Sequence, residues 1–481
     1  MTDPIFATFA LYLVAMLTMG FLAYRVTKNL PDYILGGRRL SGAVAALSAG
    51  ASDMSGWLLL GLPGAVYAHG LNQVWIAVGL SIGAYLNWQF IAARLRRYTE
   101  AARDSLTLPD YLENRFHDQT RLLRIFSAIV ILFFFTVYTA AGLVGGAILF
   151  ERSFDLSYET ALWIGTVVIV AYTFLGGFLA VSWTDFAQGT LMFVALVVTP
   201  LIAIDHLGGW GATLTKVGNV SLHHLDAFSE MSVLTIVSLM AWGLGYFGQP
   251  HILARFMAIR SSSEVPKARL IGMWWMVISL YGAMFTGLVA IGYFAEAPLA
   301  NPETAFIGLT QELFNPWIAG CLLAAILAAI MSTVDSQLIV SSSALTEDFY
   351  RAIIRQQAND TELMWVGRAG VVGIALIAAF LAHDPGSTVL GLVAYAWAGF
   401  GAGFGPVIIL SLLWRRTTRN GCLAGVVVGA TMVVVWSQLQ GGLFDVYEIL
   451  PGFLAGSLTV ILVSLLGKKP EAAVVREFEQ V

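Results

Sequence analysis

The chain has 481 residues, of which 58% are hydrophobic and only 12% are charged, and its formal net charge is −4. A soluble domain carries about 25% charged residues, so the composition excludes an ordinary water-soluble protein, and the two cysteines exclude a small disulfide-stabilised scaffold. No basic block indicates nucleic-acid binding, which leaves an integral membrane protein that crosses the bilayer several times.

A bilayer core of ~30 Å requires a helix of roughly 20 apolar residues, and windows of that length predict an all-α polytopic membrane protein with about thirteen transmembrane helices. The first window lacks the basic leading segment of a signal peptide, so we interpret it as a span. The predicted spans are 6–25, 42–67, 73–93, 124–149, 158–179, 183–205, 232–254, 270–294, 316–346, 365–383, 388–413, 421–439 and 446–467.

Basic residues are distributed very unevenly between the loops that join these spans. Of the 26 lysines and arginines, 24 fall in one alternate set of loops, and the other set holds only Arg152 and Lys216. The positive-inside rule therefore predicts a multi-pass protein with its N-terminus outside and its C-terminal tail, 468–481, in the cytoplasm.

The hydrophilic stretches are too short to form a soluble domain that could supply energy. The chain has no GxxxxGK[ST] phosphate loop, and no cysteine or histidine spacing resembles a metal site. Any energy for transport must therefore come from an ion gradient. The acids are spread along the chain without a paired base or nucleophile, so we expect no enzyme.

The second span carries the features of a broken helix. Residues 48–56 contain two glycines, three serines and Asp53. Small residues alone would also suit close helix packing, but an ionisable group in the middle of a span costs ~2.5–3.5 kcal/mol on insertion scales. Asp53 therefore predicts a charged partner or an ion pathway at this break.

The seventh span carries a similar signal at residues 241–250, with three glycines and Pro250. Pro250 removes a backbone donor, although by itself it does not separate a functional break from a packing kink. The two interrupted spans are the second and the seventh, which is the spacing of two inverted five-helix repeats, spans 2–6 and 7–11. In such repeats the solute and its coupling ion bind where the helices are discontinuous.

The ninth span places hydroxyl groups beside an acid. Ser332 and Thr333 are adjacent, and Asp335 follows them. Hard cations prefer oxygen ligands of this kind, whereas the alternative is that the hydroxyls only bond back to the preceding helical turn.

Six stretches carry a resemblance to a known family: 33–38, 48–62, 106–111, 176–185, 242–256 and 394–400. They resemble the sodium:solute symporter family, in particular its bacterial sodium/proline members, over essentially the whole chain. The resemblance implies a single transporter domain, 1–481, with a LeuT-like core whose repeats occupy about 42–205 and 232–413, one added span before the core and two after it. It implies uptake of L-proline driven by inward Na⁺ across a bacterial inner membrane, with no organic cofactor and no obligate protein partner.

The resemblance also implies roles for individual residues. Sodium would be bound by the main-chain carbonyls of Ala51, Met54 and Ala329 and by the hydroxyls of Ser332 and Thr333. The residues associated with substrate are Ser55, Gly56, Tyr138, Trp242, Tyr246 and Pro250. The residues associated with sodium binding or coupling are Asp53, Asp185, Arg38 and Asp335. Asp335 stands where some relatives carry a small hydroxyl residue, so its role and the ion stoichiometry stay open.

Two alternatives to proline uptake remain at this point. The first is a Na⁺-coupled symporter of another small solute, such as pantothenate, a monocarboxylate or a sugar. The second is a channel or a sensory membrane protein.

Overall fold

The computed structural model describes residues 4–24, 30–175, 177–384 and 386–481. Three residues used in the sequence analysis lie outside these ranges: Arg25 and Lys28, which were counted for the orientation, and Gly176, which begins one of the family-like stretches.

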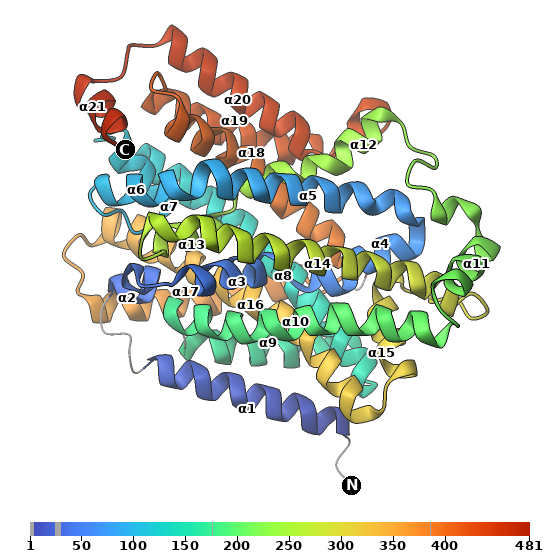
Figure 1. Cartoon of the computed structure of the whole chain (residues 1–481). Helices are drawn as coiled ribbons and strands as arrows, with labels where there is room; N and C mark the ends of the chain where they lie inside the picture. Colours follow the sequence, from blue (N-terminus) through green and yellow to red (C-terminus); the bar gives the residue numbers. More distant parts are fainter. Residues whose placement is uncertain (1–3, 25–29, 176, 385) are drawn as a thin grey trace.

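Long helices, most of them roughly parallel to one another, make up the bundle in Figure 1, with α1 along one side and α19 and α20 along the opposite side. Each predicted span corresponds to one helix or to a pair of helices. The unpaired spans are α1 (Pro4–Tyr24), α8 (Leu122–Phe154), α9 (Tyr158–Leu175), α10 (Phe178–His206), α14 (Val265–Tyr293), α16 (Pro316–Ser343), α17 (Asp360–Leu381), α18 (Val389–Leu413), α19 (Arg419–Trp436) and α20 (Ile449–Leu466). The paired spans are α3 (Gly42–Asp53) with α4 (Leu62–His69), α5 (Val74–Leu86) with α6 (Ala93–Ala101), and α12 (Val233–Met240) with α13 (Pro250–Ala258).

Length and hydropathy support most of these spans. Within the described residues, ten helices are long and apolar enough to cross a membrane, or eleven when the bent pair Gly42–Asp53 and Trp57–His69 is counted as one span. Two shorter apolar helices, Tyr158–Ala171 and Val233–Gly248, correspond to the fifth and seventh predicted spans. The seventh is shorter than a full membrane span because its helix is interrupted, as the sequence predicted.

Short helices gather at the two ends of the bundle. Figure 1 places α2 (Leu30–Leu35), α7 (Leu108–Arg115) and α21 (Ala472–Gln480) at the left-hand end, and α11 (Trp210–Val220) and α15 (Ala305–Leu313) at the right-hand end. The C-terminal stretch 468–481, predicted as a cytoplasmic tail, contains α21.

Burial follows the position of each helix in the bundle. The most apolar part of the span Pro316–Ile354, which begins with α16, is 83% buried, whereas that of α20 is only 28% buried. The outer helices expose large apolar side chains such as Phe380 at 79% and Leu466 at 87%. An apolar exterior of this kind suits lipid rather than water as the surrounding solvent.

The two interrupted spans meet at one end of the bundle. Leu40, two residues before α3, donates its N–H to the carbonyl of Ala258 at 3.2 Å, and Arg260 donates its N–H to the carbonyl of Leu40 at 3.0 Å. These bonds tie the start of the second span to the end of the seventh, so the two broken helices are held side by side.

Candidate ion and substrate site

The first break lies between α3 and α4. Helix α3 ends at Asp53, helical backbone resumes at Trp57–Gly61 (η2), and the two segments are bent by 61°. The N–H of Ser55 reaches the carbonyl of Asp53 at 3.0 Å, a turn-type bond in place of the helical pattern. A Cβ at Gly56 would lie 3.0 Å from Ile330 Cγ1, so the absence of a side chain lets the break approach α16 closely.

The second break lies between α12 and α13. Residues Ala241–Gly248 (η6) form a 3₁₀ segment, and Gln249 is extended before Pro250 starts α13. A 3₁₀ run longer than three or four residues is uncommon. At Gly248, a Cβ would overlap the carbonyl of Phe400, so only glycine permits this close approach to α18.

Side-chain donors bind main-chain carbonyls at the second break, where the regular helical hydrogen bonds are interrupted. Asn87 Nδ2 donates to the carbonyl of Tyr246 at 2.9 Å, and Trp397 Nε1 donates to the carbonyl of Trp242 at 2.7 Å. Gln249 Nε2 donates to the carbonyls of Gly245 and Trp397, both at 3.2 Å. Irregular backbone at membrane depth is tolerated where protein surrounds it in this way.

Four of the five predicted sodium ligands lie in one hydrogen-bonded cluster. Ser332 Oγ donates to the carbonyl of Ala51 at 2.9 Å and lies 3.1 Å from the carbonyl of Ala329. Thr333 Oγ1 lies 3.4 Å from the same Ala51 carbonyl. The hydroxyls therefore reach across from α16 to the broken second span as well as back along their own helix. This donor set of hydroxyl and carbonyl oxygens fits a hard cation, and the fifth predicted ligand, Met54, is fully buried at the adjoining break.

Asp53 connects the two interrupted spans. Its carboxylate oxygen Oδ2 accepts a hydrogen bond of 2.5 Å from the hydroxyl of Tyr246, whereas Oδ1 is buried without a hydrogen-bond partner among the described residues. The main-chain carbonyl of Asp53 also accepts from Trp57 Nε1 at 3.3 Å and from the Tyr138 hydroxyl at 3.4 Å. The carboxylate thus faces the predicted substrate residues, next to the predicted sodium ligands.

Aromatic side chains gather around Asp53. The rings of Trp57 and Trp242 lie 6.1 Å apart, and Tyr246 packs edge-on against Trp397 at 5.1 Å. Tyr138, Trp242 and Tyr246 are each at most 5% exposed. The structure therefore brings these three predicted substrate residues together with Ser55 and Gly56 at the meeting point of the two breaks.

Two predicted residues lie apart from this meeting point. Pro250 borders a small cavity lined by residues including Ile34, Leu106 and Ala254, and none of the three aromatic residues lines that cavity. Arg38 lies between α2 and α3, and there its Nε pairs with Asp104 at 2.8 Å and its Nη1 donates to the carbonyl of Met257 at 2.7 Å. Arg38 thus joins the segment before α3 to the end of α13 without contacting the predicted ligands.

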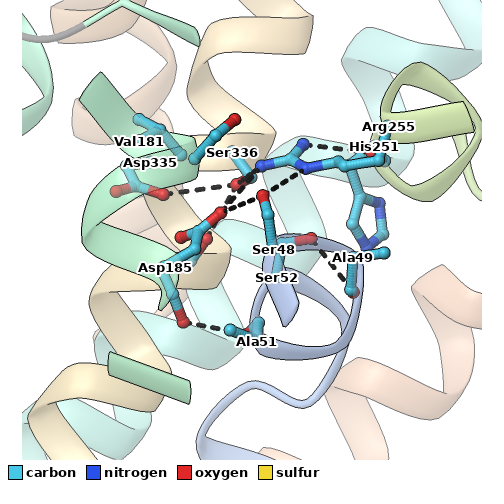
Figure 2. Close-up of polar contacts among 12 residues, drawn as sticks. Ser48, Ala49, Ala51, Ser52, Val181, Asp185, His251, Arg255, Asp335 and Ser336 are labelled. Atoms are coloured by element: carbon cyan, nitrogen blue, oxygen red, sulfur yellow. Dashed lines mark hydrogen bonds and ion pairs between the residues drawn. The ribbon is translucent and has the colours of Figure 1, made fainter. Parts of the chain in front are cut away.

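Asp185 belongs to a buried network that the sequence did not predict. Figure 2 shows the guanidinium of Arg255, from α13, in hydrogen-bonding reach of Ser48, Asp185 and Ser336. Asp185 Oδ2 accepts from Arg255 Nη2 at 3.2 Å and from the Ser48 hydroxyl at 2.6 Å. Asp335 lies beside this network, with Oδ1 3.4 Å from Ser336 Oγ.

A family model matches most of the chain. Residues 33–429 match the sodium:solute symporter family. The chain belongs to that family.

Relatives within the family match this symporter from end to end. It is 54% identical to the sodium/proline symporter of Escherichia coli K12 over 485 residues, which covers 100% of this chain and 96% of the relative. It is also 54% identical to the high-affinity proline transporter PutP of Bacillus subtilis 168, covering 96% of this chain and 98% of the relative.

Solved structures confirm the LeuT-like fold of the symporter. A Na⁺-coupled sialic acid symporter in a substrate-bound outward-open state aligns with a TM-score of 0.82 at 17% identity, covering 97% of this chain and 99% of that one. MhsT in complex with L-phenylalanine aligns with a TM-score of 0.56 at 13% identity, covering 88% of this chain and 97% of that one.

Sequence reasoning missed two residues of this symporter's site. Arg255 was counted among the loop residues, but α13 continues to Ala258 and buries the Arg255 side chain to 1% exposure. Tyr447 was not singled out, yet its ring lies 5.2 Å from that of Trp242 and its hydroxyl donates to the carbonyl of Ala394 at 2.7 Å. The sequence held a signal for Arg255, because a lone arginine directly after a broken apolar span is a candidate for burial. Tyr447 is one of 16 tyrosines, and nothing in the sequence distinguishes it from the others.

The end of the symporter where α18 begins has a buried acid that the sequence analysis also missed. Glu303 accepts hydrogen bonds from the N–H groups of Val389 and Leu390, each at 3.0 Å, and so caps the start of α18. A Cβ at Gly64 would lie 2.9 Å from the Glu303 backbone, so the second half of the first broken span packs against the same residue. Burial raises the pKa of Glu303, although both backbone hydrogen bonds oppose the shift.

Replacing Glu303 by alanine should loosen this end of the symporter. Hydrogen bonds to a charged group contribute about 1.5–3 kcal/mol each, so amide exchange in the first turn of α18 should accelerate by about tenfold or more. Hydrogen–deuterium exchange of peptides covering 388–395 measures the effect. Glu303→Gln keeps one acceptor oxygen and should give a smaller change, whereas equal exchange in all three proteins would show that the cap does not hold α18.

Proposed function

We propose that the chain is a secondary active transporter that couples inward movement of Na⁺ to uptake of L-proline by alternating access. The observation that carries the proposal is the junction of the two breaks, where the Asp53 carboxylate binds the Tyr246 hydroxyl beside the oxygen cluster of Ser332, Thr333 and Ala51. One place thus holds oxygen ligands for a cation and an aromatic, polar lining for a small solute. The full-length similarity to sodium/proline symporters supports proline as that solute.

Proline suits this junction chemically. It is a zwitterion with a compact apolar ring, and its carboxylate needs hydrogen-bond donors. A helix that restarts after a break offers unpaired N–H groups and the positive end of its dipole, and here the restart follows Ser55 and Gly56. Tyr138, Trp242 and Tyr246 offer an apolar lining for the ring, and a cationic amine gains ~0.5–2 kcal/mol over an aromatic face.

Sodium acts in this proposal by fixing the first break. The predicted ligands come from both the second and the ninth span, so a bound ion would hold Ala51 and Met54 in place against Ser332 and Thr333. That pre-orders the segment 52–56 before proline binds. Each Na⁺ that enters also releases ~2.3 kcal/mol per 100 mV of membrane potential, which supports roughly 40-fold accumulation of a neutral solute.

We further propose that all 481 residues act as one transporter domain in the inner membrane of a bacterium, with core repeats at about 42–205 and 232–413. The uneven distribution of basic residues supports a cytoplasmic position for the left-hand end in Figure 1, where α2, α7 and α21 lie. The N-terminus then lies outside and the C-terminus inside.

Uptake by the purified protein in proteoliposomes tests the function. We expect labelled proline to accumulate when Na⁺ is imposed outside and not when K⁺ replaces it. Unlabelled pantothenate, a monocarboxylate and a sugar should not compete, whereas unlabelled proline should. Uptake that ignores the Na⁺ gradient, or that another solute of this panel inhibits more strongly than proline does, would contradict the proposal.

Sodium and proline should strengthen each other's binding. If Na⁺ orders the break that receives the proline carboxylate, proline affinity must be higher with Na⁺, and linkage requires proline to raise Na⁺ affinity by the same factor. A coupling of ~1–3 kcal/mol corresponds to about 5- to 150-fold. The measurement is the proline dissociation constant of the detergent-solubilised protein with and without Na⁺. Equal constants would contradict the coupling mechanism.

A further inference from the structure

Tyr447 connects α12, η6 and α18, although it lies outside all three. It belongs to the segment between α19 and α20, two residues before α20 begins. Its N–H donates to Ser238 Oγ of α12 at 2.7 Å, and its hydroxyl donates to the carbonyl of Ala394 in α18 at 2.7 Å. Its ring lies 5.2 Å from that of Trp242 in η6, with 30° between the ring planes. Tyr447 is therefore anchored at both ends, with its ring against Trp242.

The segment that precedes α20 is itself fixed in place. At the end of α19, Trp436 Nε1 donates to the carbonyl of Val446 at 3.0 Å. A Cβ at Gly401 of α18 would lie 2.7 Å from Ile449 Cδ1 and 2.8 Å from Gly245 Cα, so the first turn of α20 and η6 both approach α18 closely. The tyrosine ring is thus presented from a backbone that packs against the second break.

Trp242 is the predicted substrate residue that this tyrosine contacts. Its backbone carbonyl accepts from Trp397 Nε1 at 2.7 Å, and its ring also lies 6.1 Å from that of Trp57. Among the described residues no hydrogen bond holds its indole nitrogen, so packing against neighbouring rings sets the position of its ring. Its backbone lies in a 3₁₀ stretch, whose hydrogen-bond geometry is poorer than that of an α-helix. The ring of Trp242 therefore depends on its neighbours for its position.

We propose that Tyr447 is a positioning residue that fixes the ring of Trp242 and thereby limits the solute site to an imino acid with a five-membered ring. The proposal rests on the proposed function and names what sets its solute selectivity. With Tyr447 in place, the ring of Trp242 cannot retreat, and a six-membered ring has no room for its extra methylene. The proposal also gives α20, which lies outside the proposed core repeats, a part in solute selection.

Competition between two imino acids tests this in proteoliposomes. The probe is uptake of labelled L-proline, and the competitor is L-pipecolate, its six-membered homologue. The measured quantity is the pipecolate inhibition constant divided by the proline KM. One methylene in an apolar pocket changes selectivity by about 10- to 200-fold, so the unaltered protein should give a ratio in that range. In Tyr447→Ala the ratio should fall by about tenfold or more. A smaller amount of folded transporter lowers the maximal rate but leaves this ratio unchanged.

Three further variants separate the ring from the fold. Tyr447→Phe loses only the bond to Ala394 and keeps the ring, so it should retain most of the selectivity. Tyr447→Leu keeps an apolar side chain without the ring and should lose selectivity, which gives a decision even if Tyr447→Ala does not fold. The matched control is Phe444→Ala, because Phe444 lies in the same segment, is 41% exposed and packs against Trp436 at 5.0 Å. It should leave the ratio unchanged.

A double substitution shows whether Tyr447 acts through Trp242. Trp242→Phe alone should lower the ratio, and adding Tyr447→Ala should lower it little further, because two residues that act through one contact are not additive. An unchanged ratio in folded Tyr447→Ala or Tyr447→Leu, an equal fall in Phe444→Ala, or additive losses in the double variant would overturn the proposal. Each of these results leaves Na⁺-driven proline uptake by the unaltered protein intact, so failure of this proposal and failure of the proposed function are distinguishable.

Discussion

Asp53→Asn should abolish Na⁺-driven proline uptake, or raise the Na⁺ concentration that it requires, while leaving the protein folded in the membrane. The carboxylate is 2% exposed and its Oδ2 accepts a 2.5 Å hydrogen bond from Tyr246. Asparagine has nearly the same shape but lacks the charge that draws a cation towards this region and strengthens the tyrosine bond. Losing a hydrogen bond to a charged group costs about 1.5–3 kcal/mol, which predicts a loss of at least about tenfold in apparent affinity. The measurement is proline uptake against Na⁺ concentration, normalised to the amount of transporter.

Tyr246→Phe is the matched control for this experiment. It removes the hydroxyl that binds Asp53 and keeps the ring that packs against Trp397 at 5.1 Å. We expect it to weaken proline affinity before sodium affinity, because the ring lies on the solute side of the junction. An Asp53→Asn protein with unchanged sodium dependence would remove Asp53 from the site, whatever Tyr246→Phe does.

The breaks could be predicted from the sequence because their signals are local. Glycine, serine and proline within ten residues mark where helical hydrogen bonding fails, and the structure breaks at 54–56 and at Gln249, inside the predicted segments. The internal form of each break was not predictable. The eight-residue 3₁₀ stretch Ala241–Gly248 depends on Asn87 and Trp397, which belong to other helices.

The ion network at Arg255 shows why the rest of the site was missed. The predicted seventh span stopped at 254, where the apolar run ends, and so left Arg255 in a loop. The helix continues because Asp185, Ser48 and Ser336 satisfy the guanidinium, and these residues come from three other spans. A pattern read along one segment contains no information about partners that lie 70, 81 and 207 residues away.

Ser332→Ala and Thr333→Ala should weaken Na⁺ binding more than any other hydroxyl deletions in α16. Back-bonding within the helix was the alternative for these residues, yet Ser332 Oγ reaches Ala51 of the broken span at 2.9 Å, slightly closer than the 3.1 Å to Ala329 of its own helix. Each alanine deletes one of five predicted oxygen ligands and leaves the helix intact, since alanine is the best helix former.

The expected size of this effect is a 10- to 100-fold rise in the Na⁺ concentration that half-saturates proline uptake, about the loss caused by removing groups that support a metal site. The matched control is Thr286→Ala, because Thr286 of α14 is equally buried and its hydroxyl bonds back to the carbonyl of Gly282 at 2.8 Å. If both site variants respond to Na⁺ as the Thr286→Ala protein does, their hydroxyls are only capping their own helix. The cation must then bind elsewhere. In that case the structure would give no reason for Na⁺ to order the first break before proline binds.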